Sequence, residues 1–483
     1  MKKIYKSLMV IAATISLAAC SSVSSSSFIS SFNNPSSSLV DSSSDSSSSI
    51  KFFNSGNTNY SYSEFNEALT LHAVNELRNP ADVGHYYQSK TYANDENYLA
   101  FKNKFKVFAA KLSESFVKRE YTSEDNITLS PLSIELCVGL AIYAATGQTR
   151  QELLNVFDID FATFNTYYKV YFDELNRERK NSLGEIVSQL LLTNSIWMDK
   201  NVEFINKGLD DLKNDYYCYA YQADFKNQNK ESCDDIAEFI YNKTKGLIRP
   251  DLQLSTETLF VLMNTLYLKD VWNDGSELSY TVDEYDFING DGSKTKKRLL
   301  GGHYYEGKAL ETSDYTSFYT KTDANYSLHF VKPHTGKNIK DIFNKDTISY
   351  VLDSGNYIYR DEEKMEKYYT QCLFPEYQAS SKLDLKKMFK EDFNVNALFD
   401  PNGTLNNVCQ GPAYVQDFVH ITKLEVNKRG IEGAAVTYMA YPGAAYDPYQ
   451  RVNETFVVDK EFGFIVTSSE GSVLFSGIVS NLK

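Results

Sequence analysis

The sequence predicts a large mixed α+β domain, with helices in its first part and sheets in its later part. Three observations favour this class. One apolar stripe recurs at steps of three and four residues, as on one face of a helix, and consists of Phe101, Phe105, Phe108, Leu112 and Phe116. Later segments are short, rich in β-branched and aromatic residues, and bounded by turn formers. The stretch Asn-Gly-Asp-Gly at 289–292 is a strong reverse-turn signal.

The first residues predict export from the cell. Lys2, Lys3 and Lys6 precede an apolar run at 8–19, which is too short for a permanent membrane helix and suits a signal peptide. The run ends in Leu-Ala-Ala-Cys, which resembles the lipobox of bacterial lipoproteins and implies cleavage before Cys20 and a lipid on its sulfur. We expect a protein on the extracellular face of the membrane, lipid-anchored, or secreted. The alternative is an ordinary signal peptide with an incidental cysteine.

Three further segments follow the predicted signal peptide of residues 1–19. Residues 20–59 are rich in serine without hydrophobic period, which predicts a flexible tether. Residues 60–98 form an extension without assigned role, in which 63–77 is a possible helix. Residues 99–483 form the compact domain. Past Cys20 the cysteines lack C-x-x-C spacing and are interpreted as buried small hydrophobes, with a Cys218–Cys233 bridge conceivable: Cys137, Cys218, Cys233, Cys372 and Cys409.

Within the domain, helices are predicted from their start signals. Ser130 before Pro131 supplies a capping oxygen and a proline for the first turn. Thr149 and Glu152 form the spacing of a capping box. Later helices are expected at 234–243 and 383–389. Strands are predicted at 194–198, 218–225, 259–267, 327–331, 419–426, 456–458, 462–466 and 473–479.

Composition limits the classes of partner. The chain has 483 residues, of which 42% are hydrophobic and 14% aromatic, enough for a large core and too apolar for a mainly disordered protein. The formal net charge of −14 argues against general affinity for nucleic acid or anionic membrane surfaces. Any membrane contact is expected through the N-terminal lipid only. We expect no nucleic acid partner, no cofactor and no metal, and a monomer.

The most informative segment runs from His420 to Arg451. A strand at 420–427 is followed by Lys-Arg-Gly, then by small or β-branched residues at 431–437, then by a long loop that reaches a strand at Phe456. Read with period two, Ile431, Gly433, Ala435 and Thr437 line one face and Glu432, Ala434 and Val436 the other. Because proline is absent until Pro442, this segment is compatible both with exposure and with becoming a central strand.

Several motifs in order resemble the serpin family, over residues 99–483. They are the helix start at 129–134, the strand motif at 264–272 that ends in Trp272, the strand and hinge at 420–437, and the C-terminal strand pair at 456–481. The resemblance implies three β-sheets, about eight or nine helices and an exposed reactive loop at about 430–455. It also implies a suicide inhibitor of extracellular serine proteases, or less often papain-like cysteine proteases, rather than an enzyme. After cleavage, the loop inserts into the central sheet.

The resemblance also implies residue roles. Gly430 is the pivot of a hinge that comprises Gly430, Ile431, Glu432, Gly433, Ala434, Ala435, Val436 and Thr437. A hydrogen-bonded cluster under the opening of the sheet consists of Ser130, Ser133, Asn194 and His420, and Trp272 lies where insertion begins. Ile431 and Gly433 depart from the family's usual residues, without adding charge or proline.

The reactive bond is less sharply predicted, because the loop is longer than is usual in the family. The usual hinge spacing leads to Ala444–Ala445, with Tyr446–Asp447 next. Small and aromatic residues at these bonds suit elastase-, subtilisin- or chymotrypsin-like proteases. Arg451 is expected to lie too close to the returning strand to serve a trypsin-like protease.

Two other functions are weighed. Ser130, Ser133 and His420 are residue types that hydrolases use, but no Gly-x-Ser-x-Gly elbow accompanies them and no His-Glu-x-x-His pairing is present. A serpin fold that binds without inhibiting, displayed on the surface, is the stronger alternative. A hinge with proline or inward charge would favour that alternative, and 430–437 has neither.

Overall fold

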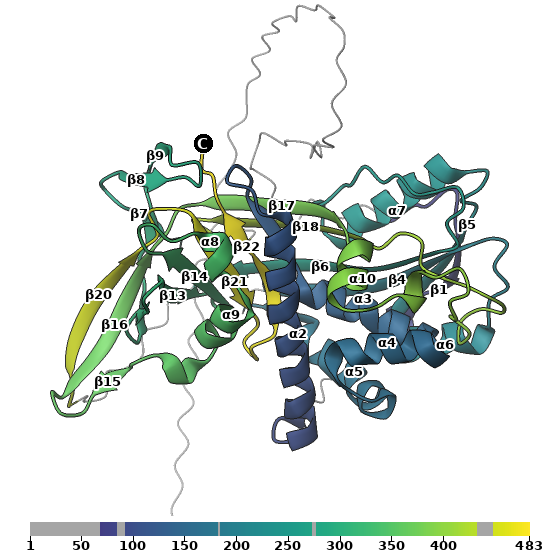
Figure 1. Cartoon of the computed structure of the whole chain (residues 1–483), viewed down its shortest axis with the longest axis horizontal. Helices are drawn as coiled ribbons and strands as arrows, with labels where there is room; N and C mark the ends of the chain where they lie inside the picture. The colour runs from purple at the N-terminus through teal and green to yellow at the C-terminus, as the bar shows by residue number, and fades with distance from the viewer. Residues whose placement is uncertain (1–67, 85–91, 182–183, 273–276, 432–447) are drawn as a thin grey trace, which may run out of the picture. The chain divides into compact units, whose positions relative to one another are not determined.

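The computed structural model describes residues 68–84, 92–181, 184–272, 277–431 and 448–483. In these ranges it contains nine α-helices, one large sheet, two smaller sheets and two short two-stranded ribbons (Figure 1). The prediction of a mixed α+β fold with eight or nine helices is therefore confirmed. No helix among the described residues is long and apolar enough to cross a membrane.

The first helices form largely as their sequence predicts. In α2 (Glu96–Glu120) the whole phenylalanine and leucine stripe is buried. Helix α3 (Pro131–Ala144) begins after Ser130, whose Oγ accepts a hydrogen bond from the backbone N–H of Ser133 at 3.3 Å. Every residue of α3 is buried, because it packs against both the central and the six-stranded sheets. The predicted cap at Ser130 is thus confirmed.

The capping box predicted at Thr149 is wrong. Helix α4 (Gly147–Phe157) starts three residues earlier than a cap at Thr149 implies, with Thr146 at the cap. The Glu152 carboxylate instead accepts hydrogen bonds from the backbone N–H groups of Asn396 and Ala397, both at 2.7 Å. A tertiary partner therefore takes the side chain that the local pattern assigned to the helix end.

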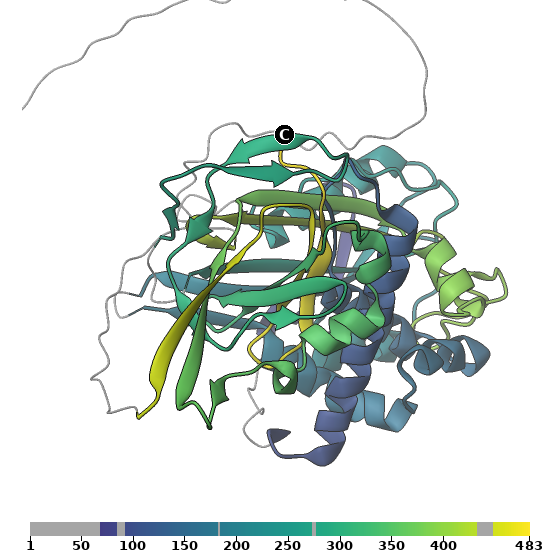
Figure 2. The ribbon, with the colours of Figure 1, turned by 60° about the vertical axis from the view of Figure 1, so that its left-hand side comes forward.

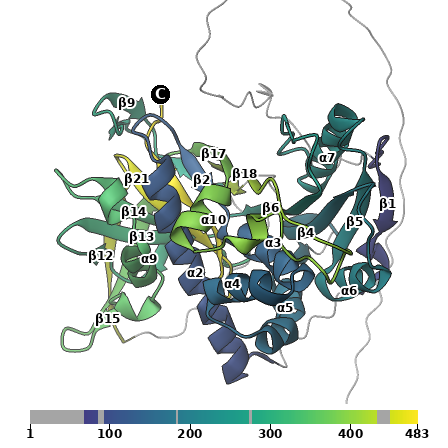
Figure 3. The same cartoon turned by 45° about the vertical axis from the view of Figure 1, so that its right-hand side comes forward.

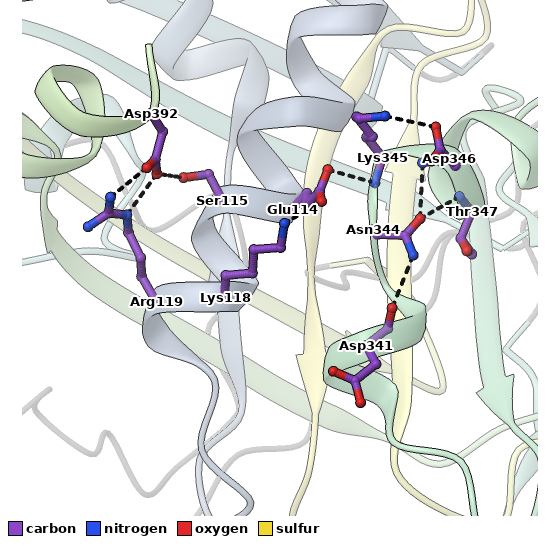
Figure 4. Close-up of polar contacts among 10 residues, drawn as sticks. All are labelled: Glu114, Ser115, Lys118, Arg119, Asp341, Asn344, Lys345, Asp346, Thr347 and Asp392. Atoms are coloured by element: carbon purple, nitrogen blue, oxygen red, sulfur yellow. Dashed lines mark hydrogen bonds and ion pairs between the residues drawn. The ribbon is translucent and has the colours of Figure 1, made fainter. Parts of the chain in front are cut away.

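The remaining helices surround the sheets. They are α5 (Phe161–Leu175), α6 (Asn206–Tyr216), α7 (Asn229–Lys243), α8 (Ile339–Ile342), α9 (Lys345–Val351) and α10 (Lys386–Asp392). Polar contacts fix the C-terminal half of α2 between two of them (Figure 4). Arg119 and Ser115 on α2 both bind the Asp392 carboxylate of α10, and Glu114 accepts from the backbone N–H of Lys345 in α9.

The central sheet has eight strands in the order β1-β5-β4-β6-β19-β18-β17, with β3 paired to β4. Their bounds are β1 (Asn75–Arg78), β5 (Cys218–Ala223), β4 (Ile186–Asp199), β6 (Phe260–Val271), β19 (Gly430–Ile431), β18 (Val419–Asn427), β17 (Tyr377–Asp384) and β3 (Arg177–Lys180). The long strands β6 and β18 run in the same direction, since both are antiparallel to β19 between them.

The six-stranded sheet has the order β12-β13-β14-β21-β22-β2. Its strands are β12 (Leu310–Glu311), β13 (Tyr315–Lys321), β14 (Ser327–Pro333), β21 (Phe462–Thr467), β22 (Val473–Val479) and β2 (Ile127–Leu129). Every residue of β21 and β22 is buried, as continuous apolar runs in the sequence indicate for strands covered on both faces. Helix α2 packs against β22, so this sheet and the first helix share one core.

The four-stranded sheet carries the chain back from the predicted reactive loop. It contains β11 (Tyr304–Glu306), β16 (Glu366–Leu373), β15 (Arg360–Asp361) and β20 (Gln450–Val457). Strands β16 and β20 lie side by side as a long ribbon (Figure 2). The two short ribbons are the hairpin of β8 (Tyr285–Ile288) and β9 (Lys294–Lys297), which turns at the predicted 289–292, and the pair of β7 (Ser279–Tyr280) and β10 (Leu300–Gly301).

Three other expectations differ from the structure. The possible helix at 63–77 is wrong where the structure describes it, since 68–74 contain no helix and β1 begins at Asn75. The returning strand begins at Gln450, six residues before the predicted Phe456, and its additional residues are mostly polar and pair with β16. Cys218 and Cys233 are free, so the conceivable bridge between them is not formed. All five described cysteines are buried, and burial raises the pKa of the Cys137 thiol to about 12.

Candidate functional site

The central sheet contains a gap between β6 and β18. On one side, β6 pairs with β4 from Phe260 to Asp270, and β18 pairs with β17 along all but its last residue. On the sides that face each other, only the last residues of the two strands are paired, through the two-residue strand β19. Among the described residues no ladder joins β6 directly to β18. Along the rest of the gap, the facing edges of β6 and β18 have no strand partner within the described residues.

A small cavity of about 40 Å³ lies in this gap. Helix α3 contributes Ser130 and Ser133 to its wall, α7 contributes Ile236 and Ile240, and the two strands contribute residues 263–266 and 419–422. Two buried polar atoms of β6, Asn264 Oδ1 and Thr265 Oγ1, have no hydrogen-bond partner within the described part of the chain. Such groups are uncommon in native proteins and mark a site where a partner is missing.

Below the gap, Ser130 and His420 are in contact. The backbone N–H of Ser130 donates to His420 Nε2 at 3.1 Å, and the Ser130 hydroxyl donates to the carbonyl of Leu474 at 2.8 Å. Because Nε2 accepts, the ring is neutral in this arrangement. Burial lowers the pKa of His420 to about 3, which agrees with a neutral ring at physiological pH.

Ser133 and Asn194 meet through a residue that the sequence analysis did not assign to the cluster. The Ser133 hydroxyl donates to the backbone carbonyl of Asn264 at 3.0 Å. The Asn264 amide donates to Asn194 Oδ1 at 2.9 Å, and the Asn194 amide donates to the hydroxyl of Tyr168 and the carbonyl of Tyr216. An amide within an otherwise apolar strand was the available signal for Asn264. Of the four predicted residues, Ser130 contacts His420 directly, and Ser133 and Asn194 are linked through Asn264.

At the other end of the gap, Trp272 lies where the chain leaves β6. Its ring is fully buried and donates from Nε1 to the carbonyl of Asn427 at 2.9 Å, so it connects the ends of β6 and β18. Lys428 and Arg429, which link β18 to β19, both form ion pairs with Glu277. These contacts hold the turn that precedes Gly430.

The first two residues of the predicted hinge lie within the central sheet. Gly430 and Ile431 pair with both β6 and β18, and Ile431 is fully buried. Opposite Ile431 lies the buried Asp270 carboxylate, which accepts from the backbone N–H of Ala324 at 2.9 Å. Burial raises the pKa of Asp270 to about 6.

Of the remaining predicted residues, the structure describes only Arg451. Arg451 lies in β20, with its guanidinium 4.2 Å from the ring centroid of Tyr369, which agrees with the expectation that it lies close to the returning strand. The other predicted positions lie outside the described residues: Cys20, Glu432, Gly433, Ala434, Ala435, Val436, Thr437, Ala444, Ala445, Tyr446 and Asp447.

The cluster does not have the geometry of a hydrolase. The hydroxyls of Ser130 and Ser133 donate to backbone carbonyls, and His420 binds a backbone N–H rather than either hydroxyl. A nucleophile needs a base within hydrogen-bond reach. In the ranges that the structure describes, no group of three His, Cys, Asp or Glu side chains is arranged to hold a metal ion. The polar groups instead connect α3 to the two strands that border the gap.

This arrangement defines a class of protein: one whose central sheet, within the described residues, is open between two parallel strands and has a two-residue strand at one end of the opening. Residues 103–482 match the model of the family described as Serpin (serine protease inhibitor), and the chain therefore belongs to the serpin family. Members of this family are protease inhibitors rather than enzymes.

Relatives and solved structures agree with this assignment. The chain is 27% identical to human antithrombin-III over 375 residues, which cover 74% of this chain and 76% of that protein. The native structure of tengpin, a thermophilic serpin, has a TM-score of 0.64 at 21% identity and covers 78% of this chain and 94% of tengpin. The structure of human thyroxine-binding globulin in complex with thyroxine has a TM-score of 0.64 at 17% identity. The match covers 79% of this chain and 99% of the globulin. The two structural likenesses carry the fold alone.

Proposed function

We propose that this protein is a membrane-tethered suicide inhibitor of extracellular serine proteases, which acts as a monomer through cleavage of its reactive loop and insertion of the freed hinge into the central sheet. The observation that carries the proposal is the gap between β6 and β18, whose upper end β19 already occupies. A cut in the loop would release the chain after Ile431 to continue that strand.

The register of β19 predicts where each hinge residue would go. Continuing it pairs Gly433 with Leu268 and Leu424, and Ala435 with Leu266 and Thr422. Thr437 would come opposite Asn264 and His420. Four of these neighbours line the cavity described above: Asn264, Leu266, His420 and Thr422. The hydroxyl of Thr437 would arrive beside Asn264 Oδ1, which has no hydrogen-bond partner within the described residues.

The faces of the sheet are compatible with insertion. Along β18 the residues alternate between partly exposed and buried, with His420, Thr422 and Leu424 on the buried face. Cross-strand partners share a face, so Gly433, Ala435 and Thr437 would point inward. Glu432 would point to the other face, opposite Lys269 and Glu425 in the continued register. No charge of the hinge would therefore be buried in the core.

The length of the gap also agrees with the predicted reactive bonds. In the same register Tyr438 reaches Val419 and Tyr441 reaches Phe260, the first residues of β18 and β6. Pro442 would come just past the last ladder position, where its missing N–H is not needed. A cut at Ala444–Ala445 or Tyr446–Asp447 would thus free enough chain to fill the gap.

Insertion would give partners to the strand edges that now lack them. At about 1 kcal/mol net for each hydrogen bond, a strand that pairs on both sides would stabilise the cleaved protein by on the order of 10 kcal/mol. The intact protein would be metastable, held by the barrier to insertion. That stored free energy is what such an inhibitor would use to trap its protease.

The finer features of the proposal come from the sequence. The Leu-Ala-Ala-Cys motif supports a lipid on Cys20, with residues 20–59 as the tether. Small and aromatic residues near the predicted bonds favour elastase-, subtilisin- or chymotrypsin-like serine proteases, with papain-like cysteine proteases as a less common target.

Incubation of the protein with one protease of each of these three specificities tests the proposal. We expect a covalent complex that survives SDS with at least one protease, and mass spectrometry of the released peptide identifies the cut bond. Complete cleavage of the loop by all three without a complex would contradict inhibition of these proteases and support a non-inhibitory surface binding protein instead.

A further inference from the structure

Helix α7 and the sheet enclose a second hydrophobic cluster, separate from the main core. We call it the outer cluster, and its buried members are Trp197, Tyr221, Ala223, Phe225, Ile236, Phe239, Ile240, Ile248 and Val261. It lies between α7 and strands β4, β5 and β6. Two of its members on α7, Ile236 and Ile240, also line the cavity in the gap. The outer cluster is therefore where α7 is held on the sheet, beside the space that an inserting strand would fill.

The segment at 68–84, which the proposed inhibition does not use, covers the open side of this cluster. Leu69, Leu71 and Val74 pack against it and are partly buried, whereas Thr70 and His72 between them are exposed. The segment then continues as β1, antiparallel to β5, with Glu76 opposite Tyr221. Figure 3 shows β1 at the outer edge of the sheet beside β5, between α7 and α6.

Polar contacts attach this segment to α7. The Asp235 carboxylate of α7, which is only 5% exposed, accepts hydrogen bonds from the backbone N–H groups of His72 at 2.9 Å and Ala73 at 2.6 Å. Hydrogen bonds to an ionised carboxylate are stronger than neutral ones. Asp235, which binds the segment, is followed in α7 by Ile236, which lines the cavity.

Other polar contacts attach the segment to α6. Arg78 donates from Nε to Asp210 at 2.6 Å and from Nη2 to Asn206 at 2.9 Å, and Asp82 forms an ion pair with Lys213 at 2.8 Å. The segment thus contacts three elements that follow one another in the chain, far from the segment itself: α6, β5 and α7.

We propose that the outer cluster with the edge of β5 is a binding surface for an extended peptide, that residues 68–84 are its occupant, and that this occupant restrains α7 over the gap and slows insertion. In the continued register of β19, Val436 would point to the α7 side of the sheet, where Ile236 and Ile240 now lie. Helix α7 would therefore have to move away before a strand enters. The effect on insertion rests on the function proposed above, whereas the restraint on α7 does not.

Two neighbouring aspartates give a matched test in the full chain. Asp235→Ala removes the acceptor of both backbone N–H groups, and Asp234→Ala removes the same charge from an exposed side chain that pairs with Lys230. By hydrogen-exchange mass spectrometry we expect Asp235→Ala to speed exchange in 68–78 and in α7 about tenfold or more. Asp234→Ala should exchange like the unsubstituted protein. Equal exchange in the two variants would overturn the proposal.

A second pair of variants changes residues of the segment itself, and it tests the proposal if Asp235→Ala does not fold. Leu71→Ala removes a contact with the outer cluster, and Thr70→Ala changes its exposed neighbour. We expect Leu71→Ala alone to speed exchange in α7, and to speed conversion of uncleaved protein to a heat-resistant form on warming. Faster exchange in 68–78 with unchanged α7 would refute the restraint. Should no protease form a complex, the proposed inhibition fails, and the exchange comparison still decides whether α7 is restrained.

Discussion

A β-carbon on Gly430 would lie 2.0 Å from the backbone carbonyl oxygen of Asp270, closer than any real side chain approaches. The φ angle of Gly430 is +156°, in a region that residues with side chains rarely adopt. The chain therefore enters the gap at a position where only glycine fits, and the pivot that the family resemblance implies has a steric basis.

Gly430→Ala should destabilise the intact protein, because the methyl group collides with the main chain of β6. We expect a loss of about 2 to 4 kcal/mol in the free energy of unfolding, measured by urea denaturation. Gly411→Ala is the matched control, since Gly411 has a φ of +80° but open space around its β-carbon. It should lose only about 1 to 2 kcal/mol from the backbone conformation. Equal losses would show that the contact with Asp270 is relaxed.

His420 should make stability depend on pH. Its pKa is about 3 in the folded protein against 6.5 as the ordinary value, so the unfolded chain binds more protons between these limits. Stability is then full above pH 6.5 and falls below it, by up to about 1.4 kcal/mol per pH unit.

His420→Gln keeps an acceptor for Ser130 and removes this titration. Between pH 7.5 and 5 the variant should lose about 2 kcal/mol less than the unsubstituted protein, measured from urea midpoints. His329 has a pKa also near 3, and the raised pKa of Asp270 changes stability with pH in the opposite direction. Both residues are present in both proteins, so their contributions cancel when the two pH profiles are subtracted. Parallel pH profiles would mean that His420 is protonated without loss of structure.

A charge on the inward face of the hinge should convert inhibitor to substrate. Ala435→Glu would place a carboxylate between Leu266 and Thr422 on insertion, whereas Ala434→Glu would place it on the other face beside Lys423. Since an unpaired buried charge opposes insertion by several kcal/mol, we expect the yield of covalent complex to fall about tenfold or more for Ala435→Glu only. The reverse order would mean that the strand inserts in another register.

Cleavage of the loop should raise heat resistance. If insertion stabilises the protein by on the order of 10 kcal/mol, the nicked form should melt about 10 °C or more above the intact form. Differential scanning calorimetry of the two forms measures this. Coincident melting would contradict insertion, whatever the effect on any protease.

Local patterns in the sequence predicted much of the fold. The stripe that begins at Phe101, the cap at Ser130 and the turn at 289–292 all depend on residues within a few positions of one another, and all three are confirmed. The box at Thr149 failed because Glu152 binds a loop more than 200 residues away. The possible helix at 63–77 is wrong over its described part, because Leu69, Leu71 and Val74 pack against a cluster formed by residues far along the chain.

The residues of the candidate site also differ in how far they could be predicted. The resemblance to the serpin family indicated Ser130, Ser133, Asn194 and His420 as one cluster. For Asn264 the local signal was only an amide within a mostly apolar strand, because its role comes from contacts with both Ser133 and Asn194 across the sheet.

By itself, the sequence determined which stretches are helix, strand or turn, the alternation that lets 431–437 serve as a strand, and the family. Only the tertiary structure decided that no ladder joins β6 directly to β18 among the described residues, that Ile431 is already between them, and that 68–84 lie across β5 and α7. The physical reason is that periodicity and capping act over a few residues, whereas a gap in a sheet is a relation between strands that only the packing of the whole domain can set.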